Sequence, residues 1–230
     1  VTDPLRHMKL APPLIALALL TTAAPGQGKP AASTEAAYPG EWRQWRGPSR
    51  MGAVAEAAWP ERLTEENVTR QWRIELGPSY SGPVVSNNLV FTTSTEDKEK
   101  EVVTAVDRRS GRVVWSTSWE GAMKVPFFAN RNGSWIRSTP AFDGESLFVA
   151  GMLDVLVSLD AQTGKQNWRV DFTERFGSNR ESFGFVCSPL VDGEAVYVQT
   201  GAGVIKLDKA TGETIWRSMD EDGGMMGGAF

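Results

Sequence analysis

Apolar and polar residues alternate along most of the chain after residue 80, in short runs separated by turn-forming residues. Residues 195–198, Ala-Val-Tyr-Val, lie in one such run. Alternation with a period of two over four to six residues is typical of half-buried β-strands rather than helices. The runs come in groups of four, over residues 81–118, 138–172 and 187–218. We therefore predict a four-stranded antiparallel meander in each group.

A nine-residue motif lies in the second half of each group, with Asp first, Gly fifth and Trp ninth. An Asp carboxylate can accept hydrogen bonds from backbone N–H groups two or three residues on, and Gly adopts the positive φ of a tight turn without steric cost. The Trp falls in the last strand, where a large flat ring can pack between neighbouring sheets. Because the Asp residues are equivalent across the repeats, we interpret them as turn residues rather than cation ligands. The three copies are Asp107, Gly111 and Trp115; Asp160, Gly164 and Trp168; and Asp208, Gly212 and Trp216.

The spacing of these copies predicts the fold class. Successive motifs are 53 and 48 residues apart, and repeats of about 40–50 residues with four strands are typical of β-propeller blades, which bury their faces against one another. We predict an all-β fold, a partial β-propeller of four-stranded antiparallel blades. It has about three blades plus an orphan N-terminal strand that carries Trp72. Because about four to eight blades close a ring, we expect the chain to be the N-terminal part of a longer protein.

The first residues predict export. From Met8, a lysine is followed by an apolar run over residues 10–20 and then by small and polar residues. This is the pattern of a secretory signal peptide, and the run is too short to span a bilayer; the alternative is a disordered apolar leader. We expect a signal peptide with an upstream extension at 1–26, a linker and irregular segment at 27–71, and an incomplete propeller at 72–230. The mature chain is then periplasmic or extracellular, without a transmembrane segment.

Composition excludes several kinds of chemistry. The net charge is −4, and no basic patch indicates nucleic-acid binding. The only histidine, His7, lies in or before the leader, and the only cysteine, Cys187, lies in an apolar run. The mature segment therefore lacks Ser-His-Asp catalysis, histidine metal sites and an internal disulfide. We predict no catalytic residue and no metal site in it.

Two long connections, residues 124–137 and 174–185, mix aromatic and cationic side chains. Long loops at corresponding places in successive blades lie on one propeller face, where binding sites are common. We predict that this face holds a protein partner or a small anionic or sugar-like ligand; the alternative is packing between blades with solvated arginines. Residues 96–101, of mixed charge, are expected to form a solvated hairpin loop; the alternative is a loop that binds a partner. The candidate ligand residues are Phe127, Arg131, Trp135, Arg137, Arg175, Arg180 and Phe183.

The motif around Ala105, Asp107, Gly111 and Trp115, with its two copies, resembles the tryptophan-docking repeat of the pyrroloquinoline-quinone (PQQ)-like β-propellers. The opening "WRQWRGPSRMG" (42–52) is similar to the segment that precedes the blades in exported bacterial members. The resemblance covers residues 42–230. It implies membership of a superfamily that includes quinoprotein alcohol and glucose dehydrogenases, outer-membrane assembly scaffolds and proteins of unknown role. The quinoprotein alcohol dehydrogenases carry adjacent cysteines, which this chain lacks.

We therefore expect an exported binding or scaffold propeller, without a cofactor in this segment. One alternative is the N-terminal part of a PQQ-dependent alcohol or sugar dehydrogenase, which would use PQQ and Ca²⁺. The second is an outer-membrane protein assembly scaffold, although no cysteine stands directly after the apolar run of the leader, where a lipid would be attached.

Overall fold

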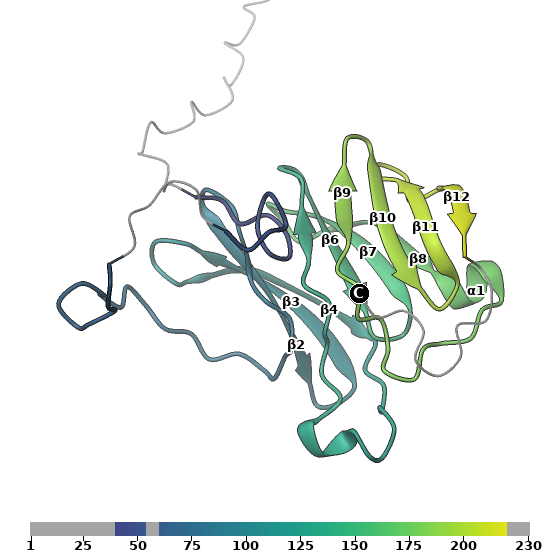
Figure 1. Cartoon of the computed structure of the whole chain (residues 1–230), viewed down its shortest axis with the longest axis horizontal. Coiled ribbons are helices and arrows are strands. Elements are labelled where there is room, and N and C mark those ends of the chain that lie inside the picture. Colours follow the sequence, from purple (N-terminus) through teal and green to yellow (C-terminus); the bar gives the residue numbers. More distant parts are fainter. Residues whose placement is uncertain (1–39, 54–59, 220–230) are drawn as a thin grey trace, which may run out of the picture. The chain divides into compact units, whose positions relative to one another are not determined.

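A computed structural model describes residues 40–53 and 60–219 (Figure 1). The predicted signal peptide at 1–26 and the first part of the predicted linker, 27–39, lie outside the described residues. The described part of the chain forms three four-stranded antiparallel sheets, and the strands of each sheet pair in chain order. The predicted all-β class with four-stranded meanders is confirmed.

The strands of the three sheets are short and regularly spaced. Two short helices interrupt the connections: the 3₁₀ helix η1 (Asn130–Asn132) and α1 (Phe172–Phe176). The first sheet holds β1 (Val84–Val85), β2 (Leu89–Glu96), β3 (Lys100–Asp107) and β4 (Val113–Glu120). The second holds β5 (Ala141–Phe142), β6 (Ser146–Gly151), β7 (Val155–Asp160) and β8 (Gln166–Asp171). The third holds β9 (Leu190–Asp192), β10 (Ala195–Thr200), β11 (Gly203–Asp208) and β12 (Thr214–Ser218).

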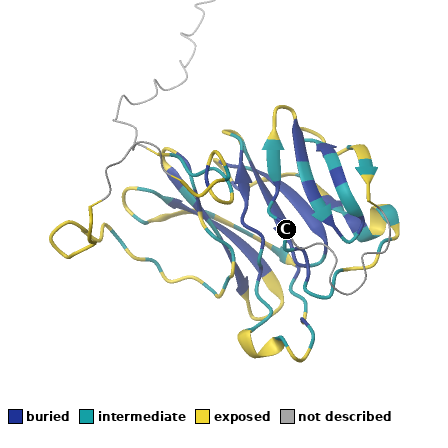
Figure 2. Cartoon of the chain, viewed as in Figure 1, coloured by how far each residue is buried: buried dark blue, intermediate teal, exposed yellow. Residues whose placement is uncertain are grey.

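The second sheet is buried on both faces. Along β6, Leu147 and Val149 belong to an apolar cluster shared with the first sheet, whereas Phe148 and Ala150 belong to a cluster shared with the third. Successive side chains of a strand point to opposite faces, so a strand of alternating contacts must lie between two layers. Figure 2 shows the burial concentrated in the middle strands of the sheets. The sheets therefore stack face to face, as propeller blades do.

Each turn of the repeated motif is closed by its own aspartate. Asp160 Oδ1 accepts hydrogen bonds from the backbone N–H of Thr163 at 2.8 Å and from its hydroxyl at 2.7 Å. These bonds, the hydroxyl bond most of all, lower the pKa of Asp160. Gly164 has a φ of +71°, which favours glycine. Asp107 and Asp208 accept the same bonds from Ser110 and Thr211.

The tryptophan of one sheet docks on the turn of the next. The Trp168 indole N–H donates a 3.0 Å hydrogen bond to the Lys209 carbonyl. The Trp168 ring covers Gly212, where a Cβ would lie 2.8 Å from the ring. Trp115 covers Gly164 in the same way, and a Cβ there would lie 2.5 Å from its ring. The predicted seams between sheets are therefore built from one indole and one glycine each.

Trp72 repeats this arrangement from outside the sheets. Its indole N–H donates a 2.9 Å hydrogen bond to the Arg108 carbonyl, and its ring covers Gly111. Residues 70–79 belong to no strand of the described sheets. The predicted orphan strand is therefore not a strand, because this segment pairs with no sheet in the described residues. It still supplies the docking ring for the first sheet.

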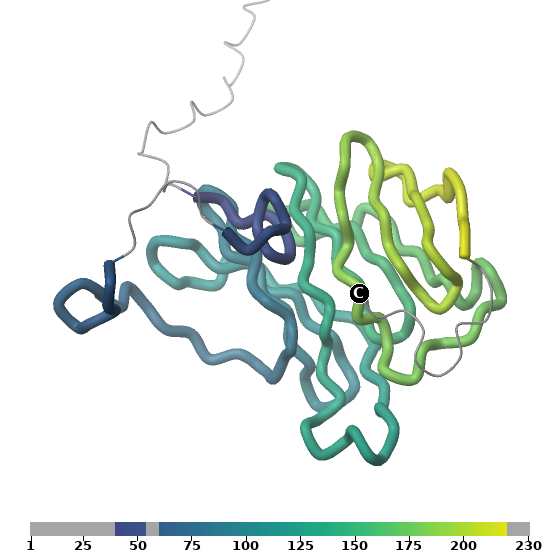
Figure 3. Tube along the Cα trace, viewed as in Figure 1, coloured from purple at the N-terminus to yellow at the C-terminus, as the bar shows by residue number. Residues whose placement is uncertain are grey.

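The segment at residues 42–43 runs beside the first strands of two sheets. Trp42 forms an antiparallel bridge with Val85 of β1, and the Phe142 N–H of β5 donates to the Arg43 carbonyl at 2.8 Å. The chain trace in Figure 3 shows this early segment lying against the sheets. Because unpaired strand edges attract other chains, the segment protects both short strands.

One expectation about residues 96–101 is wrong. Only the tip of the hairpin is a turn, because β3 begins at Lys100. Glu101 is fully buried, and its carboxylate accepts hydrogen bonds from Trp119 Nε1 at 2.7 Å and from the Met152 N–H of the second sheet at 2.6 Å. Desolvation raises its pKa to about 7. A carboxylate in this place joins the two sheets instead of facing solvent.

Candidate functional site

The three sheets are tied together where their first strands begin. Gly82, Thr139 and Ser188 each precede a proline that leads into β1, β5 and β9. The Gly82 N–H donates to Thr139 Oγ1 at 3.0 Å, and the Thr139 N–H donates to Ser188 Oγ at 3.1 Å. Equivalent positions of successive repeats therefore meet at one end of the sheets.

A cavity of about 390 Å³ opens at this end, and we call it the strand-start pocket. It combines aromatic walls with hydroxyl groups and two guanidinium groups. Pockets of about 300–1,000 Å³ with a few convergent polar groups are typical small-molecule sites. Its lining residues are Trp45, Arg50, Tyr80, Arg137, Thr139, Val186 and Ser188.

Both arginines of the strand-start pocket keep a buried nitrogen without a hydrogen-bond partner among the described residues: Arg50 Nη1 and Arg137 Nε. The Arg137 guanidinium lies 5.0 Å from the centre of the Tyr80 ring, and that of Arg50 lies 5.5 Å from the Trp45 ring. Burial lowers the pKa of Arg137. Guanidinium groups nevertheless stay protonated in proteins, and a buried donor left unsatisfied costs about 1–3 kcal/mol. An anion in the pocket would remove that cost.

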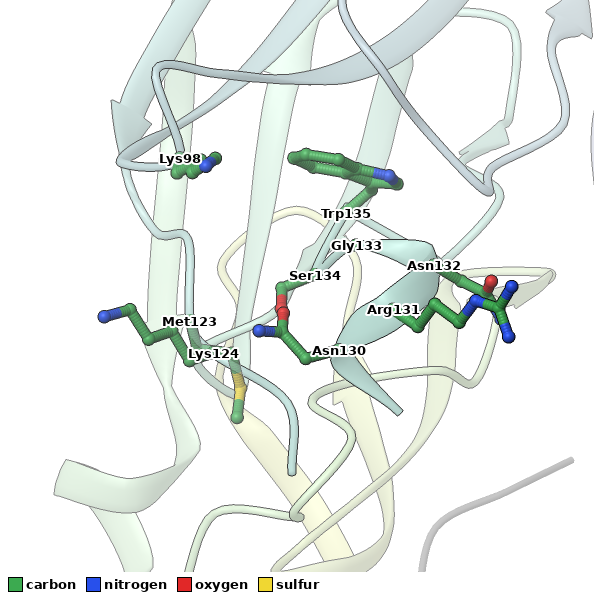
Figure 4. A pocket seen from close by; sticks show the side chains of 9 residues that line it. All are labelled: Lys98, Met123, Lys124, Asn130, Arg131, Asn132, Gly133, Ser134 and Trp135. Atoms are coloured by element: carbon green, nitrogen blue, oxygen red, sulfur yellow. The ribbon is translucent and has the colours of Figure 1, made fainter. Parts of the chain in front are cut away.

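A second cavity, of about 520 Å³, lies between the β2–β3 hairpin and the connection that contains η1; we call it the loop pocket. Figure 4 shows Lys98 reaching from the hairpin toward the Trp135 ring, with Ser134 and Asn130 on the other side of the gap. Tyr80 of the strand-start pocket donates a hydrogen bond to the Asn132 carbonyl, so the two pockets are neighbours, although they have no lining residue in common. The loop pocket is lined by Lys98, Met123, Lys124, Asn130, Arg131, Asn132, Gly133, Ser134 and Trp135.

The tips of the two long connections meet through aromatic rings. The Phe127 and Phe128 centroids lie 5.7 Å apart, and Phe128 and Phe183 lie 6.1 Å apart, both edge to face. Phe127 is 92% exposed. The connections at 124–137 and 174–185 therefore lie side by side, and their contact is open to solvent.

The predicted ligand residues divide among different places. Arg131 and Trp135 line the loop pocket, Arg137 lines the strand-start pocket, and Phe127 and Phe183 belong to the aromatic contact. Arg175 donates from Nη1 to the Gly212 carbonyl at 2.7 Å, so it stabilises the seam with the third sheet instead of lining a pocket. The alternative for these connections placed the arginines in solvent, whereas Arg175 is hydrogen-bonded across the seam.

Arg180 is exposed and lies near Asp154. Asp154 is only 1% exposed, and its backbone is in the left-handed conformation, with a φ of +62°. Desolvation raises the pKa of Asp154 to about 7, and Arg180 opposes that shift.

Cys187 is also buried, and burial raises the pKa of its thiol. Across the described residues, no three His, Cys, Asp or Glu side chains are grouped as metal ligands.

Several lining residues of the strand-start pocket were not among the predicted ligand residues: Trp45, Arg50, Tyr80, Thr139, Val186 and Ser188. A signal for part of this set was present in the sequence. A hydroxyl residue precedes the strand-leading proline in two repeats, at Thr139 and Ser188, and an aromatic precedes it by three in another, at Tyr80. Arg50 has no such signal, because its segment lies outside the repeats.

A family model described as "Outer membrane protein assembly factor BamB", of the PQQ-like repeat type, matches residues 99–229, more than half of the chain. The chain belongs to the PQQ-like β-propeller repeat family. Its three sheets are therefore propeller blades.

Relatives within this family differ in their described roles. The chain is 24% identical over 192 residues to a polyvinylalcohol dehydrogenase of Sphingopyxis sp. (strain 113P3), covering 77% of the chain and 28% of the relative. It is 28% identical over 145 residues to the outer membrane protein assembly factor BamB of Yersinia pestis, covering 59% of the chain and 35% of the relative. The chain thus spans about a third or less of these proteins.

A solved structure with a similar fold is a quinohemoprotein alcohol dehydrogenase of Pseudomonas putida. It is 23% identical with a TM-score of 0.46, covering 64% of this chain and 21% of that one. In the described part of the chain, no helix has the length and apolar character to cross a membrane.

Proposed function

We propose that the protein is an exported binding propeller that holds an anionic ligand in the strand-start pocket. The observation that carries this proposal is a pair of buried guanidinium nitrogens, Arg50 Nη1 and Arg137 Nε, that have no hydrogen-bond partner in the described part of the chain. The segment at residues 42–43, which precedes Trp45 and Arg50, is hydrogen-bonded to two sheets. The pocket is therefore assembled by the fold before any ligand arrives.

The aromatic walls define the shape of the ligand. Trp45 and Tyr80 each lie against one of the two guanidinium groups, which leaves cationic edges and flat apolar faces together. A planar molecule with two or more carboxylates matches both features, because guanidinium and carboxylate groups form strong charge-assisted hydrogen bonds. The proposed export rests on a separate feature, the signal-peptide pattern at residues 1–26.

The experiment uses benzene-1,3,5-tricarboxylate, a planar and redox-inert probe, in calorimetric titrations of the protein. We expect binding that weakens about tenfold or more in Arg50→Met and in Arg137→Met, because each loses a charged hydrogen bond. Arg73→Met is the control, since Arg73 is exposed and pairs only with Glu75 among the described residues. Absence of binding, or equal affinity in all variants, would refute the proposal.

A PQQ-dependent dehydrogenase is the second candidate, and it is favoured by the match to a polyvinylalcohol dehydrogenase over most of the chain. PQQ is itself a planar tricarboxylate, so the orphaned nitrogens of Arg50 and Arg137 fit its charge, and Trp45 and Tyr80 fit its flat faces. When bound, PQQ would supply the two-electron oxidation of an alcohol. Here the chain's own residues would hold and orient the carboxylates.

The two candidates differ in turnover. The protein is incubated with PQQ and Ca²⁺ and then assayed for dye-linked oxidation of polyvinyl alcohol and of small primary alcohols. Retained PQQ with turnover that Arg137→Met abolishes identifies a dehydrogenase. Binding of the inert tricarboxylate without any PQQ-dependent turnover identifies a binding propeller.

A further inference from the structure

The loop pocket is a second site, and it is separate in its lining from the strand-start pocket. Two segments far apart in sequence build it: the tip of the β2–β3 hairpin and residues 123–135. Asp97 and Lys98 have φ values of +52° and +60°, and the Glu99 N–H donates to the Glu96 carbonyl at 3.0 Å. These bonds and angles describe a tight turn with positive φ at both central positions, within the three-residue connection between Glu96 and Lys100. It fixes the backbone from which Lys98 extends.

The Trp135 ring is held in place by the backbone next to it. Gly133 has a φ of +90°, and a Cβ there would lie 2.1 Å from the ring. One part of the indole therefore rests directly on the Gly133 backbone. Figure 4 shows the ring bordering the gap that Ser134 and Asn130 border on the other side. The pocket thus offers a flat apolar wall opposite hydroxyl and amide groups, and Ser134 Oγ donates to Asn130 Oδ1 at 3.3 Å.

Within residues 40–53 and 60–219, no carboxylate compensates the positive charge of the loop pocket. Three basic side chains line it, Lys98, Lys124 and Arg131, and none of the described Asp or Glu residues does. None of the three forms an ion pair or hydrogen bond with another described residue. Glu99 and Asp97 are close in sequence to Lys98 but are not part of the lining. A ligand that carries negative charge would therefore be favoured over a neutral one.

We propose that the loop pocket binds an acidic carbohydrate, with one sugar ring against the Trp135 face and its carboxylate toward Lys98 and Lys124. A bare inorganic anion would leave the Trp135 face without a partner, and a neutral sugar would leave the lysines without one. The apolar C–H face of a pyranose ring matches a flat indole, and its hydroxyl groups match Asn130 and Ser134. The volume of about 520 Å³ accommodates a short oligosaccharide rather than a single small ion.

The test compares trigalacturonate and a glucuronate-containing trisaccharide with their methyl esters, which keep the sugar shape and remove the charge. We expect calorimetric titration to show binding of at least one acid, and affinity for its ester lower by about tenfold or more. Trp135→Ala and the double variant Lys98→Ala, Lys124→Ala should each lower the affinity for the acid by a similar factor.

Three control variants keep this result interpretable. Phe127→Ala changes an exposed ring of the same connection, and Lys165→Ala changes an exposed lysine outside the pocket. Both should bind as the parent protein does. Arg50→Met removes a guanidinium group of the strand-start pocket and lies outside both segments that line the loop pocket. It should also bind the acid normally, so failure of the proposed function is distinguished from failure of this site. Binding of neither acid, equal binding of acid and ester, or unchanged binding in the pocket variants overturns the proposal.

Discussion

The indole N–H of Trp115 donates a 3.0 Å hydrogen bond to the carbonyl oxygen of Ala161, the residue after the turn aspartate of the next sheet. Trp168 makes the same bond to Lys209, and Trp72 makes it to Arg108. Each indole also covers the turn glycine three residues further on. One relationship between a ring and a turn therefore joins successive blades, and the pockets form where the joined blades end.

The hydrogen bonds of the indoles predict the effect of a conservative change. Trp115→Phe and Trp168→Phe keep an aromatic ring at the seam but remove the donor. We expect each to lower the free energy of unfolding by about 1–2 kcal/mol, since a carbonyl loses its partner and some ring contact is lost. Urea denaturation measures this change. Phe127→Ala, at a 92% exposed site, is the surface control and should change it by less than about 0.5 kcal/mol. Equal effects at all three sites would contradict the claim that the indole N–H groups stabilise the seams between sheets.

The turn glycines predict a steric effect that can be separated from backbone strain. Gly164 and Gly177 have similar φ values, +71° and +65°. A Cβ at Gly164 would lie 2.5 Å from the Trp115 ring, whereas one at Gly177 meets nothing within 4 Å. Alanine at either site costs about 1–2 kcal/mol from the left-handed conformation.

Gly164→Ala should cost at least about 2 kcal/mol more than Gly177→Ala, because the ring must leave its place. The change in unfolding free energy of the two variants, measured side by side, gives this difference. Similar values for both would show that the indole does not rest on the glycine.

The fold followed from the sequence because every repeat carries its own local signals. Asp160, Gly164 and Trp168 specify a turn and a docking ring within nine residues. The turn depends on residues close in sequence, so it can be predicted without knowing the rest of the fold. The long connections could be recognised as candidate binding loops for the same reason, since they interrupt a regular spacing.

The division of the loop residues could not be predicted from spacing. Arg175 and Arg137 occupy similar loops, yet one bonds to the Gly212 carbonyl and the other enters a pocket. That outcome depends on which neighbouring sheet each side chain reaches. The place of Arg50 in a pocket cannot be predicted from the repeats, because its segment lies outside them. The prediction that Glu101 faces solvent rests on charge alone and is wrong, because strand pairing places Glu101 between two sheets.

Glu101 predicts how stability depends on pH. Its pKa in the folded protein is raised to about 7, above the value near 4.3 of an exposed glutamate. The folded state therefore holds this proton more tightly than the unfolded state does. The stability that results is fully present below about pH 4 and is lost as the pH rises through about 7.

Glu101→Gln removes this titration. Between pH 5 and pH 8, we expect the free energy of unfolding of the parent to fall relative to that of Glu101→Gln by an amount on the order of 1–3 kcal/mol. Chemical denaturation at both pH values measures the difference. Glu120→Gln, at an exposed position on β4, should follow the parent at both. Parallel pH profiles for the parent and Glu101→Gln would disprove a buried, titrating carboxylate.

The most direct test of the central claim is the proton resonance of Arg137 Nε–H during titration with benzene-1,3,5-tricarboxylate. Arg137 Nε has no partner among the described residues, whereas Arg43 Nε already donates to the Glu41 carboxylate. A new hydrogen bond to a carboxylate shifts a guanidinium proton downfield. We predict that the Arg137 resonance moves downfield to saturation while that of Arg43 stays in place. An Arg137 resonance that does not move, with or without detectable binding elsewhere, would contradict an anion site at the strand starts.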